Sequence, residues 1–241
     1  MSGNKTNMNY ENKLCIIIPA RSGSKGIPNK NITEINGKSL LIRTVESAIK
    51  ICNIKNICLS TDSQEYYRHV AKLYNPIFLK RDGEISDDKA LAIEVWKDAL
   101  IYLNKNHIRY EYSLFLEPTS PFRNIEWIRS NIDKFMKSND DLWMSIKETD
   151  SKFRIEKQFN IKNDGYIQNN FNNADKYSLR QNSQLTYFKD GVFYIAKNNY
   201  ILETDKLFGG KIKGLINKYK SINIDTYDDL EYAEFLCLSQ D

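Results

Sequence analysis

Residues 14–31 read LCIIIPARSGSKGIPNKN, and this stretch carries the first signal for both the fold and the site. Its first five residues are apolar and mostly β-branched, a pattern typical of a strand buried on both faces of a parallel sheet. Pro19 ends the strand because proline has no N–H group to donate. The loop that follows contains two glycines, which let backbone N–H groups approach an anion. The stretch therefore predicts a buried strand followed by a loop suited to polyphosphate.

Fixed positive charge distinguishes this loop. Arg21, Lys25 and Lys30 fall within ten positions, which suits a triphosphate better than a neutral ligand. Gly23 and Gly26 match neither the dinucleotide-binding fingerprint nor the P-loop. A loop with glycine and lysine between a strand and a helix is common, so an ordinary connection is the alternative interpretation.

Strand and helix patterns alternate over the first 150 residues. Strands are expected at 14–18, 56–62, 77–80, 112–117 and 142–146, and helices at 39–50, 63–74, 87–104 and 124–138. This alternation predicts a three-layer α/β fold whose sheet is mostly parallel and whose crossovers are right-handed. Ligands of such sheets bind at the carboxyl ends of the strands.

Residues 148–190 interrupt the alternation. They are polar, and Asn163-Asp164-Gly165 is a hairpin signal. We interpret them as short strands and loops inserted into a single domain of residues 1–241. A core strand is expected to return at 191–196, and 219–224 is expected to be the last strand, before a closing helix at 226–238.

Composition excludes several classes of protein. The net charge is +4 with both signs mixed, so we expect no nucleic-acid partner. Apolar runs are too short for a membrane span, and residues 1–13 lack the apolar region of a signal peptide, so we expect a cytoplasmic protein. The four cysteines have neither metal-clip nor disulfide spacing, which indicates buried thiols. They are Cys15, Cys52, Cys58 and Cys237. The two histidines have no His or Cys nearby, so we expect neither a zinc site nor a Ser/His hydrolase.

Four segments together resemble the CMP-sialic acid synthetases, the acylneuraminate cytidylyltransferase family. Residues 18–31 resemble its signature, and 116–123 (LEPTSPFR) resemble its LQPTSPLR segment. Residues 179–194 are similar to its RQ segment and its NGAIY strand, and 222–230 (INIDTYDDL) resemble IDIDTxxDL. The resemblance implies a Rossmann-like nucleotidyltransferase that transfers CMP from CTP to the anomeric hydroxyl of a nonulosonic acid, sialic acid or a legionaminic or pseudaminic relative. Pyrophosphate is the leaving group.

The resemblance also implies roles for single residues. Arg21 and Lys30 are the expected catalytic residues, in contact with the triphosphate. The nucleotide site is expected to comprise Ala20, Arg21, Ser22, Lys25, Lys30 and Asn31. The substrate site is expected to comprise Glu117, Thr119, Ser120, Arg123, Arg180 and Gln181. Asp225 and Asn223 are the expected ligands of Mg²⁺ or Mn²⁺. Asp62 also matches a family segment, but no role is assigned to it.

Two positions depart from the family pattern. Glu117 stands where the better-known members carry Gln, and Asn223 replaces a carboxylate with an amide, which brings no charge to a metal. If the two segments converge, Glu117 supplies the missing carboxylate. The residues themselves leave simpler interpretations open: residues 116–123 as a strand with a proline-stiffened turn, Arg180 as a solvated surface residue, and Asp225 as a helix cap.

Alternatives to the expected function remain at this point. One is a related nucleotidyltransferase that activates another sugar, such as 3-deoxy-manno-octulosonate. Another is a non-catalytic nucleotide-binding protein whose metal site has decayed at Asn223. The resemblance further implies a homodimer in which residues 148–190 dimerise and cover a neighbouring active site. Selection among nonulosonic acids is expected to lie in that same region.

Overall fold

The computed structural model describes residues 12–86, 90–171 and 185–238, which form two compact units. The main unit comprises Met1–Ser145, Asp190–Leu215 and Tyr219–Asp241, and the inserted unit comprises Ile146–Lys189 and Ile216–Lys218. The expected insertion therefore starts two residues earlier, ends one residue earlier and also takes in three residues near the C-terminus. Among the described residues, no helix has the length and apolar character needed to cross a membrane.

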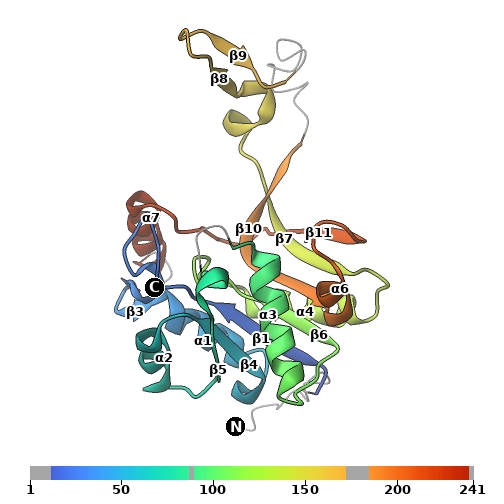
Figure 1. The fold of residues 1–241 in the computed structure, drawn as a ribbon. Coiled ribbons are helices and arrows are strands. Elements are labelled where there is room, and N and C mark those ends of the chain that lie inside the picture. The colour runs from blue at the N-terminus through green and yellow to red at the C-terminus, as the bar shows by residue number, and fades with distance from the viewer. Residues whose placement is uncertain (1–11, 87–89, 172–184, 239–241) are drawn as a thin grey trace, which may run out of the picture. The chain divides into compact units, whose positions relative to one another are not determined.

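A seven-stranded sheet organises the chain, in the order β11-β7-β10-β6-β1-β4-β5 (Figure 1). Strand β1 pairs in parallel with β4 and β6, β4 pairs in parallel with β5, and β10 is antiparallel to β6. The strands are β1 (Leu14–Pro19), β4 (Ile57–Thr61), β5 (Ile77–Lys80), β6 (Tyr112–Phe115), β7 (Leu142–Glu148), β10 (Tyr187–Lys197) and β11 (Ile212–Ile216). The expected mostly parallel α/β fold is confirmed.

Helices cover both faces of this sheet. The helices are α1 (Leu40–Ile49), α2 (Gln64–Ala71), α3 (Ala92–Lys105), α4 (Ile125–Met136), α6 (Asn198–Glu203) and α7 (Tyr227–Leu238). Alternate residues of β1, including Ile16 and Ile18, share one core with α1, α2 and α4. On the other face, Trp96 of α3 stacks on Phe115 of β6, with ring centroids 4.9 Å apart. Three layers result, as the alternation predicted.

A smaller core joins the basic loop to the end of the chain. Ile27 of the loop packs with Ile224 and with Ala233 and Leu236 of α7. The same core includes Ile35 of a short hairpin formed by β2 (Glu34–Ile35) and β3 (Lys38–Ser39), which the sequence did not predict. These contacts hold two segments about 200 residues apart in the sequence next to each other.

One predicted strand is absent, and one predicted helix begins later than expected. Residues 219–224 are not a strand, because the place beside β7 at the sheet edge is taken by β11 instead. The helix expected from residue 87 begins at Ala92. Glu94 accepts a hydrogen bond from the Leu91 backbone N–H at 2.7 Å, which fixes the first turn after Leu91.

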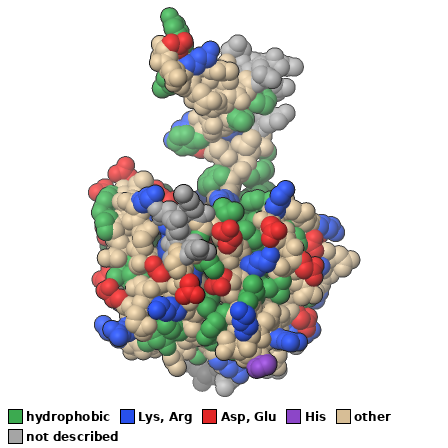
Figure 2. All heavy atoms as spheres, viewed as in Figure 1, with side chains coloured by type: hydrophobic (Ala, Val, Ile, Leu, Met, Phe, Trp, Pro, Cys, Tyr) green, Lys and Arg blue, Asp and Glu red, His purple; other side chains and the backbone are tan. Residues whose placement is uncertain are grey.

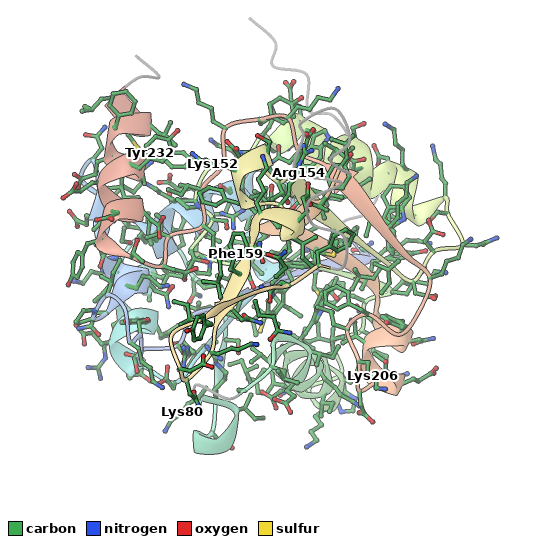
Figure 3. The ribbon with its side chains drawn as sticks, turned by 90° about the horizontal axis from the view of Figure 1, so that it is seen from above. Lys80, Lys152, Arg154, Phe159, Lys206 and Tyr232 are labelled. Atoms are coloured by element: carbon green, nitrogen blue, oxygen red, sulfur yellow. The ribbon has the colours of Figure 1, made fainter. Side chains whose placement is uncertain are left out.

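The inserted unit contains the expected hairpin. β8 (Phe159–Ile161) and β9 (Ile167–Asn169) are antiparallel, and Gly165 has a φ of +85° in the connecting turn. Only glycine adopts this conformation at no steric cost, so the Asn-Asp-Gly signal is confirmed. Inside the same unit, buried Arg154 pairs with Glu148 at 3.0 Å; Figure 3 shows Arg154 and Phe159 as sticks.

Surface charge and cysteine burial also agree with the composition. Acidic and basic side chains are interspersed on the face of the main unit seen in Figure 2, rather than gathered into a region of one sign. All four cysteines are buried and free. Burial raises the pKa of the Cys58 thiol to about 12, so this group is a neutral core residue.

Candidate functional site

The basic loop leaves β1 in a conformation held by polar side chains. Asp62, at the end of β4, accepts hydrogen bonds from the backbone N–H and the hydroxyl of Ser22, at 2.8 and 2.7 Å. Asn31 donates from its amide to the Arg21 carbonyl oxygen at 2.8 Å. Between them, Asn29 has a φ of +53° and precedes the 3₁₀ turn Lys30–Ile32. Asp62, left without a role by the sequence, thus orients the loop.

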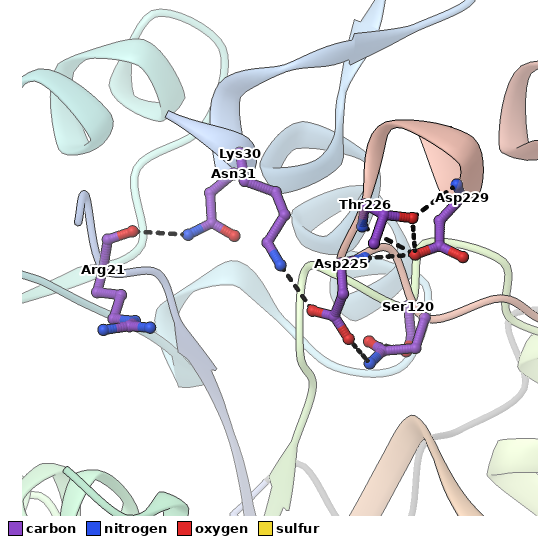
Figure 4. A network of polar contacts seen from close by, with 8 residues as sticks. Arg21, Lys30, Asn31, Ser120, Asp225, Thr226 and Asp229 are labelled. Atoms are coloured by element: carbon purple, nitrogen blue, oxygen red, sulfur yellow. Dashed lines mark hydrogen bonds and ion pairs between the residues drawn. The ribbon is translucent and has the colours of Figure 1, made fainter. Parts of the chain in front are cut away.

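Lys30 reaches across to the C-terminal segment. Its ammonium lies 2.8 Å from the Asp225 carboxylate, and its side chain is only 13% exposed (Figure 4). The structure therefore brings the loop after the first strand and the segment before the last helix into one site. The backbone of Gly26 also packs against the backbone of Asp225, so closely that a Cβ on Gly26 would lie 2.4 Å from the Asp225 carbonyl oxygen.

Asp225 is held rigidly by its neighbours. Asp229 accepts hydrogen bonds from the backbone N–H groups of Asp225 and Thr226, at 3.0 and 2.8 Å, and from the Thr226 hydroxyl at 2.8 Å (Figure 4). Burial raises the pKa of Asp229, but these hydrogen bonds outweigh it and the pKa is lowered overall. The Asp229 N–H in turn donates to the Thr226 hydroxyl at 3.2 Å, so Thr226 and Asp229 form a capping box in which Thr226, rather than Asp225, caps α7.

Residues 117–120 approach the same edge from the end of β6. The Ile224 N–H donates to the Thr119 carbonyl at 2.8 Å, and the Ser120 hydroxyl lies 3.4 Å from the Asn223 amide oxygen. Ser120 also donates to the Asp190 carbonyl at 2.9 Å. The Glu117 carboxylate and the Ser120 hydroxyl both lie within 2.7 Å of the position a Cβ would take on Gly191. Glu117 and Asn223 therefore converge through Ser120.

Arg123 lies behind this edge. Its guanidinium donates to the carbonyl oxygens of Val192 and Glu117 and to the Thr44 hydroxyl, at 2.9, 2.5 and 3.2 Å. Burial lowers its pKa to about 9, against the opposing effect of Glu117 and Asp190. These contacts tie β6, β10 and α1 together, which is a positioning role; the expected contact with substrate stays a prediction.

Arg81 is a candidate that the sequence analysis missed. It follows β5 at the same sheet edge, and its side chain is 5% exposed. Two of its guanidinium nitrogens, Nε and Nη2, have no hydrogen-bond partner among the described residues. Burial lowers its pKa to about 10, with Asp62 acting in the opposite direction and Arg21 in the same direction, which places it beside the basic loop. An arginine directly after a predicted short strand was the available signal.

Arg180 and Gln181 lie outside the described residues. Within the described ranges, no group of three or more His, Cys, Asp or Glu side chains could hold a metal ion by itself. Mg²⁺ commonly binds through one or two carboxylates together with substrate phosphates. The oxygen donors of Asp225, Asn223 and Glu117 fit that smaller protein contribution.

Comparisons with known proteins identify the family of this chain. A family model described as "Cytidylyltransferase" matches residues 15–239. N-acylneuraminate cytidylyltransferase of Escherichia coli is 32% identical over 92% of this chain, but the chain spans only about half (51%) of that relative's length. Pseudaminic acid cytidylyltransferase of Campylobacter jejuni is 29% identical over 92% of this chain and 95% of its own length.

Other relatives extend the comparison. CMP-N,N'-diacetyllegionaminic acid synthase of Campylobacter jejuni is 29% identical over 92% of the chain and 94% of its own length. The solved structure of CMP:2-keto-3-deoxy-manno-octonic acid synthetase, complexed with CTP, has a TM-score of 0.68 at 14% identity, covering 95% of this chain and all of that one. This likeness shows the fold. With a family match over nearly its whole length, the chain belongs to the cytidylyltransferase family of nucleotidyltransferase enzymes.

Proposed function

We propose that this protein transfers CMP from CTP to the anomeric hydroxyl of a nonulosonic acid and releases pyrophosphate. The observation that carries the proposal is the 2.8 Å approach of Lys30 to Asp225, which joins a cationic loop to an oxygen-rich edge. Relatives whose names specify acylneuraminic, pseudaminic and legionaminic acids support this class of sugar acid.

The proposed reaction is a single displacement at phosphorus. The anomeric oxygen of the sugar bonds to the α-phosphorus, the bond from that phosphorus to the bridging oxygen of the β-phosphate breaks, and the hydroxyl proton is released. The leaving pyrophosphate carries the charge of the broken bond. Arg21, Lys25 and Lys30 would neutralise this charge, and the backbone N–H groups of the loop would orient the triphosphate.

Asp225, Asn223 and Glu117 would hold a divalent cation, Mg²⁺ or Mn²⁺. Bound there, it would neutralise phosphate oxygens and make the α-phosphorus more electrophilic. The guanidinium of Arg81 has two nitrogens without a partner among the described residues, and we offer it as a further contact for CTP. A buried donor without an acceptor costs free energy until a ligand supplies one.

The sugar acid would bind at the end of β6. Glu117, Thr119 and Ser120 supply acceptor and hydroxyl groups there, and Arg180 and Gln181 are proposed to grip the sugar carboxylate. Arg123 would act indirectly, by fixing the backbone of Glu117 and Val192.

A substrate panel tests the proposal. Pyrophosphate release should be measured with each nucleoside triphosphate against sialic, legionaminic and pseudaminic acids and 3-deoxy-manno-octulosonate. We expect release with CTP and a nonulosonic acid. Turnover only with 3-deoxy-manno-octulosonate, or CTP binding without turnover of any acid, would contradict the proposal.

Arg21→Ala tests the role of the loop. Losing one preorganised contact to developing charge costs about 3 kcal/mol in the barrier, so turnover should fall roughly a hundredfold. Arg68→Ala, at an exposed position on α2, is a control that removes the same charge elsewhere. Near-normal turnover of the Arg21 variant would contradict its assigned role.

Glu117→Gln tests whether Glu117 compensates for Asn223. The change keeps the side chain's size but removes the charge, so activation by Mg²⁺ should weaken strongly. If the Mg²⁺ concentration needed for half-maximal rate stays the same, Glu117 does not supply the missing carboxylate.

We also propose that the protein acts in the cytoplasm as a homodimer. Phe159, Ile161, Tyr166 and Ile167 of the inserted unit expose 52–77% of their surface, which suits burial against a second copy. Ile161→Asp should lower the sedimentation coefficient to that of a monomer, whereas Asn160→Asp adds the same charge at a neighbouring exposed position and should not. A wild-type monomer would contradict the dimer.

A further inference from the structure

Each oxygen of the Asp225 carboxylate has a nitrogen donor from another side chain of the protein. One oxygen lies 2.8 Å from the Lys30 ammonium, and the other accepts a hydrogen bond from the Asn223 amide at 2.7 Å (Figure 4). The Asn223 amide is turned so that its own oxygen faces Ser120. Both carboxylate oxygens that a cation would use are therefore occupied by N–H donors.

The backbone around this pair has little freedom. Gly26 packs against the Asp225 carbonyl so closely that a Cβ would not fit, and Asp229 accepts a hydrogen bond from the Asp225 N–H at 3.0 Å. Ile27 and Ile224 are buried in the same small core. Any change at the pair must therefore come from the two side chains. Asp225, at 63% exposure, is the more accessible of the two.

Lys30 and Asp225 are also the groups to which the proposed function assigns the triphosphate and the divalent cation. While they are paired, the charge of Lys30 is offset by a carboxylate, and a triphosphate meets a neutral pair rather than a cation. A divalent cation on Asp225 would compete with the ammonium for the same oxygen. The triphosphate and the divalent cation would thus each have to break the same Lys30–Asp225 ion pair.

We propose that the Lys30–Asp225 ion pair couples the two binding events: a divalent cation on Asp225 frees Lys30 for the triphosphate, and a triphosphate on Lys30 frees Asp225 for the cation. Such coupling is reciprocal by thermodynamic necessity. The inference rests on the proposed function, and it adds a second role for Asp225: holding Lys30 back when no divalent cation is bound.

CTP binding to the full chain, measured by calorimetry without any sugar acid, tests this coupling. In EDTA, Asp225→Asn should bind CTP about twofold to fivefold more tightly than wild type, the range expected when one partly exposed ion pair no longer competes. With saturating Mg²⁺ the order should reverse, because the variant has lost a cation ligand. Asp228→Asn removes the same charge from an exposed neighbour and should leave both affinities close to wild type.

A double-mutant cycle then assigns the effect to Lys30. In a Lys30→Met background, Asp225→Asn should no longer tighten CTP binding in EDTA. An equal gain in that background, an equal gain with Asp228→Asn, or no gain with Asp225→Asn would each overturn the coupling while leaving the proposed function in place. If wild type binds CTP neither with nor without Mg²⁺, the proposed function itself fails.

Discussion

Gly26 lies where the basic loop touches the C-terminal segment, and Gly26→Ala tests whether that contact is needed for catalysis. The added Cβ would lie 2.4 Å from the Asp225 carbonyl oxygen, whereas ordinary contacts begin at 3.4 Å. The obstacle is backbone rather than the end of a flexible side chain. The loop and the segment must therefore separate by about 1 Å.

Two effects follow from this displacement. Overpacking of a well-packed junction costs about 1–3 kcal/mol, which for a chain of this size lowers the Tm by roughly 2–12 °C. A misplacement of about 1 Å at a catalytic site costs about a hundredfold in rate. At temperatures where the variant is still folded, we therefore expect kcat/KM to fall by about a hundredfold, because the loss of stability alone does not lower the activity of the folded protein.

The assay combines thermal unfolding with pyrophosphate release well below the Tm. Gly23→Ala is the matched control for stability, because a Cβ at Gly23 meets nothing within 4 Å and its Tm should stay at the wild-type value. Gly83→Ala has equally open space, lies outside residues 20–31 in the sequence, and is a second control for the added methyl group. Wild-type kcat/KM in the Gly26 variant would refute the reasoning, since the loop and Asp225 would then not need their present contact.

Three further predictions concern the supports of the site and the core. Asp229→Ala removes the acceptor of the Asp225 and Thr226 N–H groups, so the free energy of unfolding in urea should fall by about 1 kcal/mol and turnover should fall as well. Asp228→Ala should change neither, and equal effects of the two variants would contradict the role of Asp229 in the capping box. Stability should fall as pH rises from about 9 to 12, because burial raises the pKa of Cys58 and of Tyr66 to about 12, so the folded state keeps protons that the unfolded chain loses first. Urea unfolding at about pH 8 and about pH 10.5 measures this loss, and Tyr66→Phe should reduce it. If the free energy of unfolding falls with pH as steeply in Tyr66→Phe as in wild type, Tyr66 does not contribute to the loss. Ser113→Ala leaves the buried Trp96 N–H, now 2.7 Å from the Ser113 hydroxyl, without an acceptor and should cost about 1–3 kcal/mol. Adding Trp96→Phe should cost less than the sum of the two single changes, and strict additivity would contradict a direct bond.

Local patterns were sufficient for most of the fold. The apolar run at residues 14–18 and the helical periodicity at 39–50 each specify their element through neighbours a few residues away, and both were found where expected. Asn163-Asp164-Gly165 likewise gave its hairpin, since the turn is made by neighbouring residues, with Gly165 at a φ of +85°. The failure at 219–224 differs in kind. That segment alternates like a strand, but pairing needs a free sheet edge, and β11 occupies it.

For the site, the sequence supplied the chemistry and the tertiary structure supplied the arrangement. Residues 14–31 already specified a buried strand followed by clustered cations, because charge and glycine content are properties of the chain itself. Other features depended on residues far apart in the sequence. They are the pairing of Lys30 with Asp225, the internal hydrogen bonds of Arg123 and the burial of Arg81 beside the loop. Such contacts form only when the sheet order and the small core under α7 bring distant segments together, and no local pattern encodes that distance.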